Sequence, residues 1–281
     1  MAIEKSITIE KELKQIAETL ILSGTLTDCP GLIQGKTGIA IFFFHYARYV
    51  KNKLFEQYAM DLIREMQKQI HNNSPADYRT GLAGIGVGMD YLLTNHFIYS
   101  EVDIFKDFDE RLFRSVMYET WQDFSLYDGL TGYGRYWLMR FNQPSSSAIA
   151  RKCLIRIVNF IEGKLLDIQK KEQADVYGFL SEICRLPDFE HFSPILNNCL
   201  LNWDIQSMEF SRFGDSQVGK AAQKYWHNYY NNHSQTIETG QITGLNFEKE
   251  TPKVGLLYGY AGEGMLRLSV LDSKLNWMNL F

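Results

Sequence analysis

One short pattern decides the fold, and its first copy reads Gly31-Leu32-Ile33-Gln34-Gly35-Lys36-Thr37-Gly38-Ile39-Ala40. Its core is a pair of glycines separated by two residues. The same core recurs at Gly81-Leu82-Ala83-Gly84, Gly129-Leu130-Thr131-Gly132 and Gly259-Tyr260-Ala261-Gly262. From position 35 to 81 is 46 residues and from 81 to 129 is 48, while the gap from 129 to 259 has room for two more copies. A period of this length is typical of proteins built from repeated helical hairpins.

Two weaker copies fit the long gap. Val176-Tyr177-Gly178 keeps the leading glycine, and Arg212-Phe213-Gly214 keeps only that residue. We therefore expect six repeats, with their first glycines at positions 35, 81, 129, 178, 214 and 259. The alternative is six unrelated helix starts in an irregular bundle, but the residues beside the glycines also recur, which favours repeats.

Amphipathic segments separate the glycine motifs, and each motif runs into a more apolar stretch. In residues 54–70 the apolar side chains of Leu54, Tyr58, Leu62, Met66 and Ile70 are four residues apart, as on one face of a helix. The pattern therefore predicts an all-α chain in which each repeat consists of an outer amphipathic helix, a loop, the glycine motif and an inner helix. We expect the glycines to accept unusual φ angles and to let neighbouring backbones approach closely. The outer segments expected are residues 10–22, 54–70, 104–121, 149–168 and 194–203.

Composition limits the classes of function. The chain has 281 residues, 45% of them hydrophobic and 22% charged, which suits a globular protein that folds as a single domain over residues 1–281. A formal net charge of −4 argues against nucleic-acid binding. The longest apolar run, within residues 38–44, is far shorter than the roughly 20 residues that span a bilayer. Since the N-terminus lacks an apolar signal core, we expect a cytoplasmic protein with no membrane span.

The glycine pattern resembles the inner-helix signature G-L-x-x-G-x-x-G-I-A of the lanthionine synthetase C-like (LanC-like) cyclases. Residues 31–40 match that signature, residues 81–86 and 255–262 are similar to further copies, and the resemblance covers roughly residues 10–140 and 250–275. It implies an α/α toroid, in which inner helices surround a cavity and outer helices enclose them. It also implies lanthipeptide biosynthesis, where a zinc-bound peptide cysteine adds to a dehydrated residue.

The family holds its zinc with a Cys-Tyr-Gly and a Cys-His-Gly motif, and both are altered here. The corresponding copies read Val176-Tyr177-Gly178 and Arg212-Phe213-Gly214, in which no side chain is a zinc ligand. The remaining cysteines and histidines, such as Cys184 and His233, lack the family's placement. We therefore expect no zinc and no other cofactor, in a cyclase-like pseudoenzyme.

The residues just before the glycines are expected to face the mouth of the toroid. Tyr177 matches the tyrosine of the family's motif, and Asp128 occupies a slot where members can place a histidine thought to transfer protons, so both are candidate catalytic residues. A helix cap is the alternative role for Asp128, and packing is that for Tyr177. Arg79 and Lys36 could form a cationic rim or remain solvated surface charges. The candidate substrate-binding residues are Asp77, Arg79, Gln34 and Tyr258.

Three functions are consistent with these observations. The first is a zinc-less, peptide-binding or accessory protein of lanthipeptide biosynthesis, whose partners would be a precursor peptide and a dehydratase. The second is an active cyclase whose ligands lie elsewhere or come from another chain. The third is a hydrolase on a different α/α toroid, with Asp77 and Asp128 as its paired carboxylates. Six hairpins instead of the family's common seven would leave apolar flanks, which favours a homo-oligomer.

Overall fold

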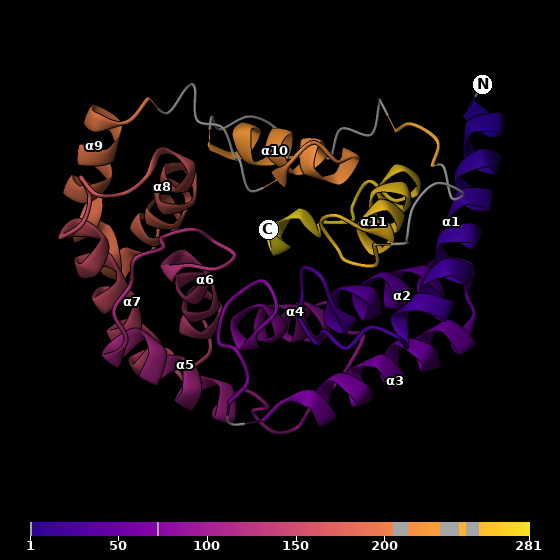
Figure 1. Cartoon of the computed structure of the whole chain (residues 1–281), viewed down its shortest axis with the longest axis horizontal. Helices are drawn as coiled ribbons and strands as arrows, with labels where there is room; N and C mark the ends of the chain where they lie inside the picture. Colours follow the sequence, from indigo (N-terminus) through magenta and orange to yellow (C-terminus); the bar gives the residue numbers. More distant parts are fainter. Residues whose placement is uncertain (1, 72, 205–212, 231–241, 246–252) are drawn as a thin grey trace. The chain divides into compact units, whose positions relative to one another are not determined.

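The computed structural model describes residues 2–71, 73–204, 213–230, 242–245 and 253–281 (Figure 1). Within these residues the chain forms eleven α-helices and no strand, which confirms the predicted all-α class. None of these helices combines the length and the hydropathy that crossing a membrane requires.

The helices belong to two compact units. Unit 1 comprises Met1–Ser74, Tyr91–Ile98 and Phe213–Phe281, and unit 2 comprises Pro75–Asp90 and Tyr99–Arg212. Unit 1 contains α1 (Ala2–Gly24), α2 (Lys36–Val50), α3 (Lys53–Gln69), α10 (Gln217–Tyr230) and α11 (Tyr260–Leu271). Unit 2 contains α5 (Lys106–Tyr118), α6 (Leu130–Phe141), α7 (Ser147–Glu162), α8 (Lys170–Cys184) and α9 (Ser193–Asn202). Residues 82–90 of α4 (Leu82–Thr94) belong to unit 2 and residues 91–94 to unit 1. That the whole chain is one domain stays a prediction.

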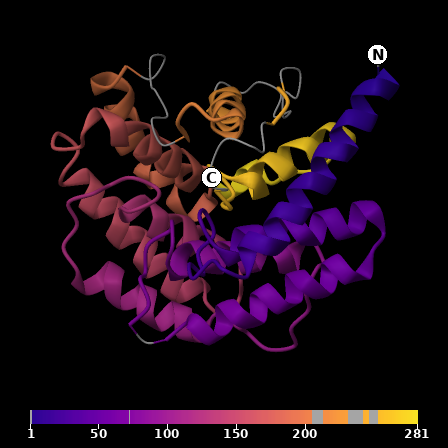
Figure 2. The same cartoon turned by 45° about the vertical axis from the view of Figure 1, so that its right-hand side comes forward.

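Two kinds of helix alternate, as the sequence predicts. In α2 every residue from Lys36 to Ala47 is buried, so this helix is surrounded by protein, with α3, α1 and α11 packed against it (Figure 2). In unit 2 the corresponding helix α6 packs against α7 and α8. Helix α7 buries a single stripe at the spacing of one helical face. That stripe consists of Ala150, Cys153, Leu154, Ile157, Val158 and Ile161.

The buried face of α3 differs from the predicted one. The face consists of Ala59, Leu62, Ile63 and Met66, at the i, i+3, i+4, i+7 spacing, so Leu62 and Met66 of the expected row are buried as predicted. Leu54 is 70% exposed and does not belong to the face. The reason is local, since Asn52 caps α3 by accepting a hydrogen bond from the backbone N–H of Leu54, at 3.0 Å, which places Leu54 in the exposed first turn.

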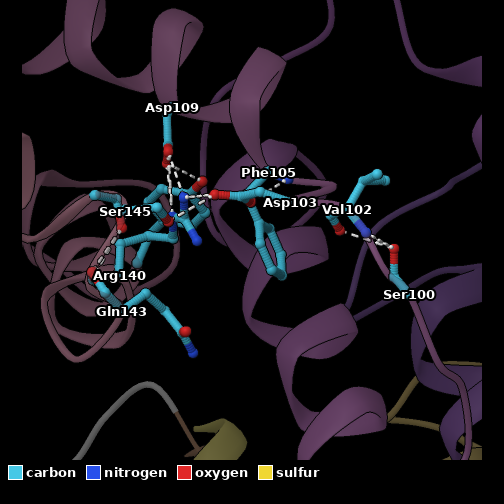
Figure 3. A network of polar contacts seen from close by, with 10 residues as sticks. Ser100, Val102, Asp103, Phe105, Asp109, Arg140, Gln143 and Ser145 are labelled. Atoms are coloured by element: carbon cyan, nitrogen blue, oxygen red, sulfur yellow. Dashed lines mark hydrogen bonds and ion pairs between the residues drawn. The ribbon is translucent and has the colours of Figure 1, made fainter.

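A buried arginine fixes neighbouring helices in each unit. In unit 1, Arg267 of α11 is fully buried and donates to the carboxylates of Glu12 and Glu263, both at 2.7 Å. In unit 2, Arg140 of α6 donates to Asp103 and Asp109, again at 2.7 Å (Figure 3). A buried charge without such partners would destabilise the fold strongly, so these ion pairs specify which helices can be neighbours.

His45 of α2 lies in the core of unit 1. Its Nε2 atom is 2.8 Å from the hydroxyl of Tyr91, and its ring packs edge-on against Phe97. Burial, together with the nearby charge of Arg48, lowers the pKa of His45 from 6.5 to about 3. The imidazole is therefore neutral in the folded protein.

This burial predicts a pH dependence of stability. The unfolded chain binds the His45 proton with a pKa near 6.5 and the folded chain only near 3, so the free energy of unfolding falls as pH drops below 6.5. Between pH 7.5 and pH 5 the loss should be about 2 kcal/mol. Urea unfolding at a series of pH values should show this slope for the wild type and for His71→Gln, whose histidine is exposed. His45→Gln should remove it, and an unchanged slope in that variant would contradict the assignment.

Candidate functional site

Each clear glycine motif closes a loop with the same hydrogen bond. In each, the residue after the first glycine donates its backbone N–H to the carbonyl oxygen seven residues earlier. These bonds are Lys36 to Cys29 at 2.9 Å, Leu82 to Pro75 at 2.9 Å, Leu130 to Asp123 at 3.0 Å and Tyr260 to Lys253 at 2.8 Å. Four loops with one geometry, two in each unit, are structurally equivalent, which confirms these four copies of the motif.

The glycines are required for space. A Cβ atom on Gly81 would lie 2.6 Å from the carbonyl carbon of Pro75, and one on Gly132 would overlap the carbonyl oxygen of Leu126. The expectation of unusual φ angles was wrong for this motif, because Gly35, Gly129 and Gly259 are all extended. Any residue could adopt their backbone angles, but only glycine leaves room for the loop to fold back.

Neighbouring loops are joined in one register. In unit 1, Leu256 donates its backbone N–H to the carbonyl oxygen of Ile33 at 2.8 Å. In unit 2, Tyr78 donates to Tyr127 at 3.1 Å. Each donor lies three residues before the first glycine of its own loop. Each acceptor lies two residues before the first glycine of the other loop in the pair. The residues just before the glycines therefore lie side by side in each pair of loops.

The two eroded copies lie elsewhere than predicted. Helix α8 begins at Lys170 with Gln169 as its N-cap, so Gly178 is inside the helix. Helix α10 begins at Gln217, where Ser216 and Gly219 take the places of the two motif glycines, because a Cβ on Gly219 would overlap the carbonyl oxygen of Phe213. The capping box of Gln169 and Glu172 was the signal for the α8 start, but a search for glycines could not detect it.

Carboxylates replace the glycine loop where α8 meets the loop before α6. Glu172 accepts a hydrogen bond from the backbone N–H of Phe124 at 3.1 Å, and Asp175 accepts one from Leu126 at 2.7 Å. Both acids are buried. Leu126 lies three residues before its first glycine, as Tyr78 and Leu256 do. Those two residues donate to a backbone carbonyl oxygen of the neighbouring loop, whereas Leu126 donates to the side chain of Asp175.

Three of the predicted site residues lie together in unit 2. Arg79 donates to both carboxylate oxygens of Asp128, from Nε at 2.9 Å and from Nη2 at 2.6 Å. The Arg79 guanidinium also lies 5.2 Å from the centre of the Tyr127 ring. Asp77 accepts a hydrogen bond from the backbone N–H of Thr80 at 2.7 Å. The arginine side chain is 29% exposed and that of Asp128 52%, so this ion pair is open to solvent.

These contacts change the expected roles. Asp128 is not the N-cap of α6, because that residue is Gly129, and both oxygens of the Asp128 carboxylate accept hydrogen bonds from Arg79. Asp77 stabilises the turn in which it lies by accepting the hydrogen bond from the backbone N–H of Thr80. Both acids therefore accept hydrogen bonds from neighbouring groups, and Arg79 is an ion-paired side chain.

The remaining predicted residues are separate from this group. In unit 1, Gln34 is exposed in the loop before α2, and the half-buried Tyr258 lies in the paired loop before α11. Tyr177 is half-buried inside α8, so the expectation that it precedes an inner helix was wrong. Lys36 is only 4% exposed and points its Nζ atom at the side-chain oxygen of Gln69, 3.0 Å away once the amide is oriented to accept, so it is not a surface charge. Arg212 and His233 lie outside the described residues.

In the described part of the chain, no three histidine, cysteine or acidic side chains gather closely enough to hold a metal ion. Burial raises the pKa of the Cys153 and Cys199 thiols to about 12. Such thiols are protonated at neutral pH and are poor nucleophiles and metal ligands. In comparisons with known proteins, no family model, no curated protein and no solved structure matches this chain.

The loop geometry predicts opposite effects for two glycine substitutions in unit 2. Gly132→Ala places a methyl group 2.7 Å from the Cβ of Tyr78 and against the Leu126 carbonyl, and should lower the free energy of unfolding by about 3 kcal/mol. Gly163 ends α7 at φ −65, and a Cβ there meets nothing nearer than 3.6 Å. Gly163→Ala should stabilise the protein by about 0.5 kcal/mol. Urea unfolding of both variants measures these changes. If Gly132→Ala did not lower the free energy of unfolding relative to Gly163→Ala, the geometry of this loop would be refuted.

Proposed function

We propose that this chain is a LanC-like α/α toroid of six repeats that binds a precursor peptide in lanthipeptide biosynthesis without zinc chemistry. The observation that carries the proposal is the shared geometry of the four glycine loops, which the LanC-like signature accounts for and an irregular bundle does not. A dehydratase and a second copy of the chain remain the partners proposed for it, and the cytoplasm its location.

The toroid is supported by a helix-to-helix contact that repeats with one offset. Five residues after the first glycine, an inner helix presents another glycine to an aromatic ring of the neighbouring inner helix. The pairs are Gly86 with Tyr136, Gly134 with Phe179 and Gly264 with Phe42. Similar contacts would turn each helix by a similar step relative to its neighbour, and a series of such steps forms a ring when the total rotation closes. These three contacts each lie within one unit. The proposal adds similar contacts between the two units, which a closed ring would require.

The zinc-less character is supported by the corrected repeat register. In the family's motifs the cysteines lie two residues before the first glycine, and the histidine lies one residue before it. In this chain the corresponding positions hold Asp167 before α8, and Gly214 and Asp215 before α10. None is a cysteine or histidine, so the chain lacks the thiolate and imidazole ligands of that site. An active cyclase and a hydrolase remain alternatives, but no contact in the described residues favours either.

Peptide recognition is assigned to the loops of unit 2. An exposed ion pair contributes little to folding stability, yet Arg79 and Asp128 are held in bidentate geometry beside the ring of Tyr127. Arginine and tyrosine are the side chains that most often carry binding energy at protein interfaces. A carboxylate of the peptide would displace Asp128 from the guanidinium without loss of hydrogen bonds.

Binding can be tested with a synthetic lanthipeptide precursor peptide, labelled with fluorescein and followed by fluorescence polarisation. Arg79→Met should weaken binding at least tenfold, while its free energy of unfolding stays within about 1 kcal/mol of the wild type. Arg64→Met is the control, because Arg64 forms an ion pair with Asp61 on α3 that is more exposed than the pair of Arg79 and Asp128, and its loss should leave binding unchanged. Equal affinity of both variants would refute the assigned residues. One zinc per chain in elemental analysis would refute the zinc-less proposal.

The ring predicts a distance between the units. In a ring of six inner helices spaced 8–10 Å apart, α2 and α8 are opposite, with their axes about 20 Å apart. Spin labels carried by non-canonical amino acids at the exposed positions Gln34 and Lys170 should give one narrow distance distribution near this value, widened only by the label arms. Labels at Gln34 and Lys253, both in unit 1, serve as the reference for a fixed pair. A broad distribution for the first pair alone would exclude a closed ring.

A further inference from the structure

A pocket lies in unit 1 at the C-terminal end of α2, the end opposite its glycine loop. Its volume is about 330 Å³, within the range of small-molecule sites. Phe44, Ala47 and Phe97 give it an apolar wall, and Phe44 and Ala47 are themselves buried. Unit 1 therefore offers a concave, partly apolar surface at the end of α2 that lies away from its own glycine loop.

Two residues of this pocket have an unusual backbone. Lys51, which ends α2, has φ 53, and His96, which follows α4, has φ 56. Among the described residues other than glycine, these are the two with positive φ. Glycine is the favourable residue at such helix ends, because any side chain is strained there. Both positions nevertheless hold a basic side chain, and both line the same pocket.

The basic side chains of the pocket outnumber its acidic ones. Arg48, Lys51 and Lys53 line it beside a single carboxylate, that of Glu56, in a chain whose net charge is −4. Arg48 is held in place, since its guanidinium lies 3.8 Å from the centre of the Phe97 ring and donates to the carbonyl oxygen of Asn95 at 2.9 Å.

The helix dipoles account for only part of this charge. A cation at the C-terminal end of α2, such as Arg48 or Lys51, is favourable by itself. Lys53, however, is the first residue of α3, where the positive end of the helix disfavours a lysine. The positive charge of Lys53 is repelled by the positive end of the α3 dipole. An anion in the pocket would compensate both the lysine charge and the helix dipole.

From these observations we infer that the pocket binds a small organic anion. Its anionic group is held by Lys51 and Lys53, with Arg48 beside them, and its apolar part packs on Phe44 and Phe97. This site is independent of the peptide loops and of zinc, so it stands whether or not the proposed function is right.

The inference can be tested by isothermal titration calorimetry of the full chain with phenyl phosphate, benzoate, inorganic phosphate and phenol. Phenyl phosphate should bind best, since it has both the charge and the ring, and benzoate shows whether a carboxylate serves equally well. Inorganic phosphate and phenol should each bind at least tenfold more weakly. Phenol binding as tightly as phenyl phosphate would overturn the role of the cations.

Lys51→Gly separates binding from folding. Glycine relieves the positive φ, so this variant should melt at a higher temperature than the wild type while it binds phenyl phosphate at least fivefold more weakly. Lys53→Ala should weaken binding to a similar extent. Lys14→Ala, which removes an exposed lysine of α1 in the same unit, should leave binding unchanged. Unchanged affinity in Lys51→Gly and Lys53→Ala, or an equal loss in Lys14→Ala, would refute the site.

Discussion

The backbone hydrogen bond that closes each glycine loop is the constraint on which the rest of the structure depends. It brings the chain back onto itself immediately before a helix, so tightly that a Cβ atom at the first glycine would overlap the carbonyl group six residues earlier. The helix that follows therefore starts at a fixed residue with a fixed direction. Because the loop satisfies its own polar groups, it needs no capping side chain, as at the uncapped helices α2, α6 and α11.

From these fixed starts, packing follows by repetition of small contacts. Gly86, Gly134 and Gly264 each admit an aromatic ring of a neighbouring helix, and α7 packs against α6 with a single apolar face. The buried ion pairs of Arg267 and Arg140 then select particular neighbours, because a misplaced helix would leave a charge without a partner. Small residues permit the close approach, and charged residues make it specific.

The polar groups of the chain divide by burial into two roles. Arg140 and Arg267 are almost completely buried and hold helices together, whereas the pair of Arg79 and Asp128 faces solvent on a loop that is already closed by its backbone. The lysines at the far end of α2 resemble the second group, since they occupy strained or electrostatically unfavourable positions that folding alone does not reward. A side chain whose position is not explained by folding stability is a good candidate for a binding residue.

The sequence by itself determined the all-α class, the alternation of helices buried on one face with more completely buried helices, and the four loops with intact glycine pairs. It could do so because helical periodicity and the absence of a side chain are local properties, read directly from residues such as Gly35 and Gly259. The sequence also grouped Asp77, Arg79 and Asp128 with Gln34, Tyr177 and Tyr258, because all of them lie shortly before a glycine, and the structure brings only the first three together. Only the tertiary structure decided that α8 and α10 start at Lys170 and Gln217, that Lys36 is buried, and that Arg79 holds both oxygens of Asp128. The pocket beside Phe97 likewise combines the ends of α2 and α4 with the start of α3. The ion pair of Arg79 and the pocket depend on groups 40 or more residues apart in the chain, and no local pattern specifies how side chains at that separation meet.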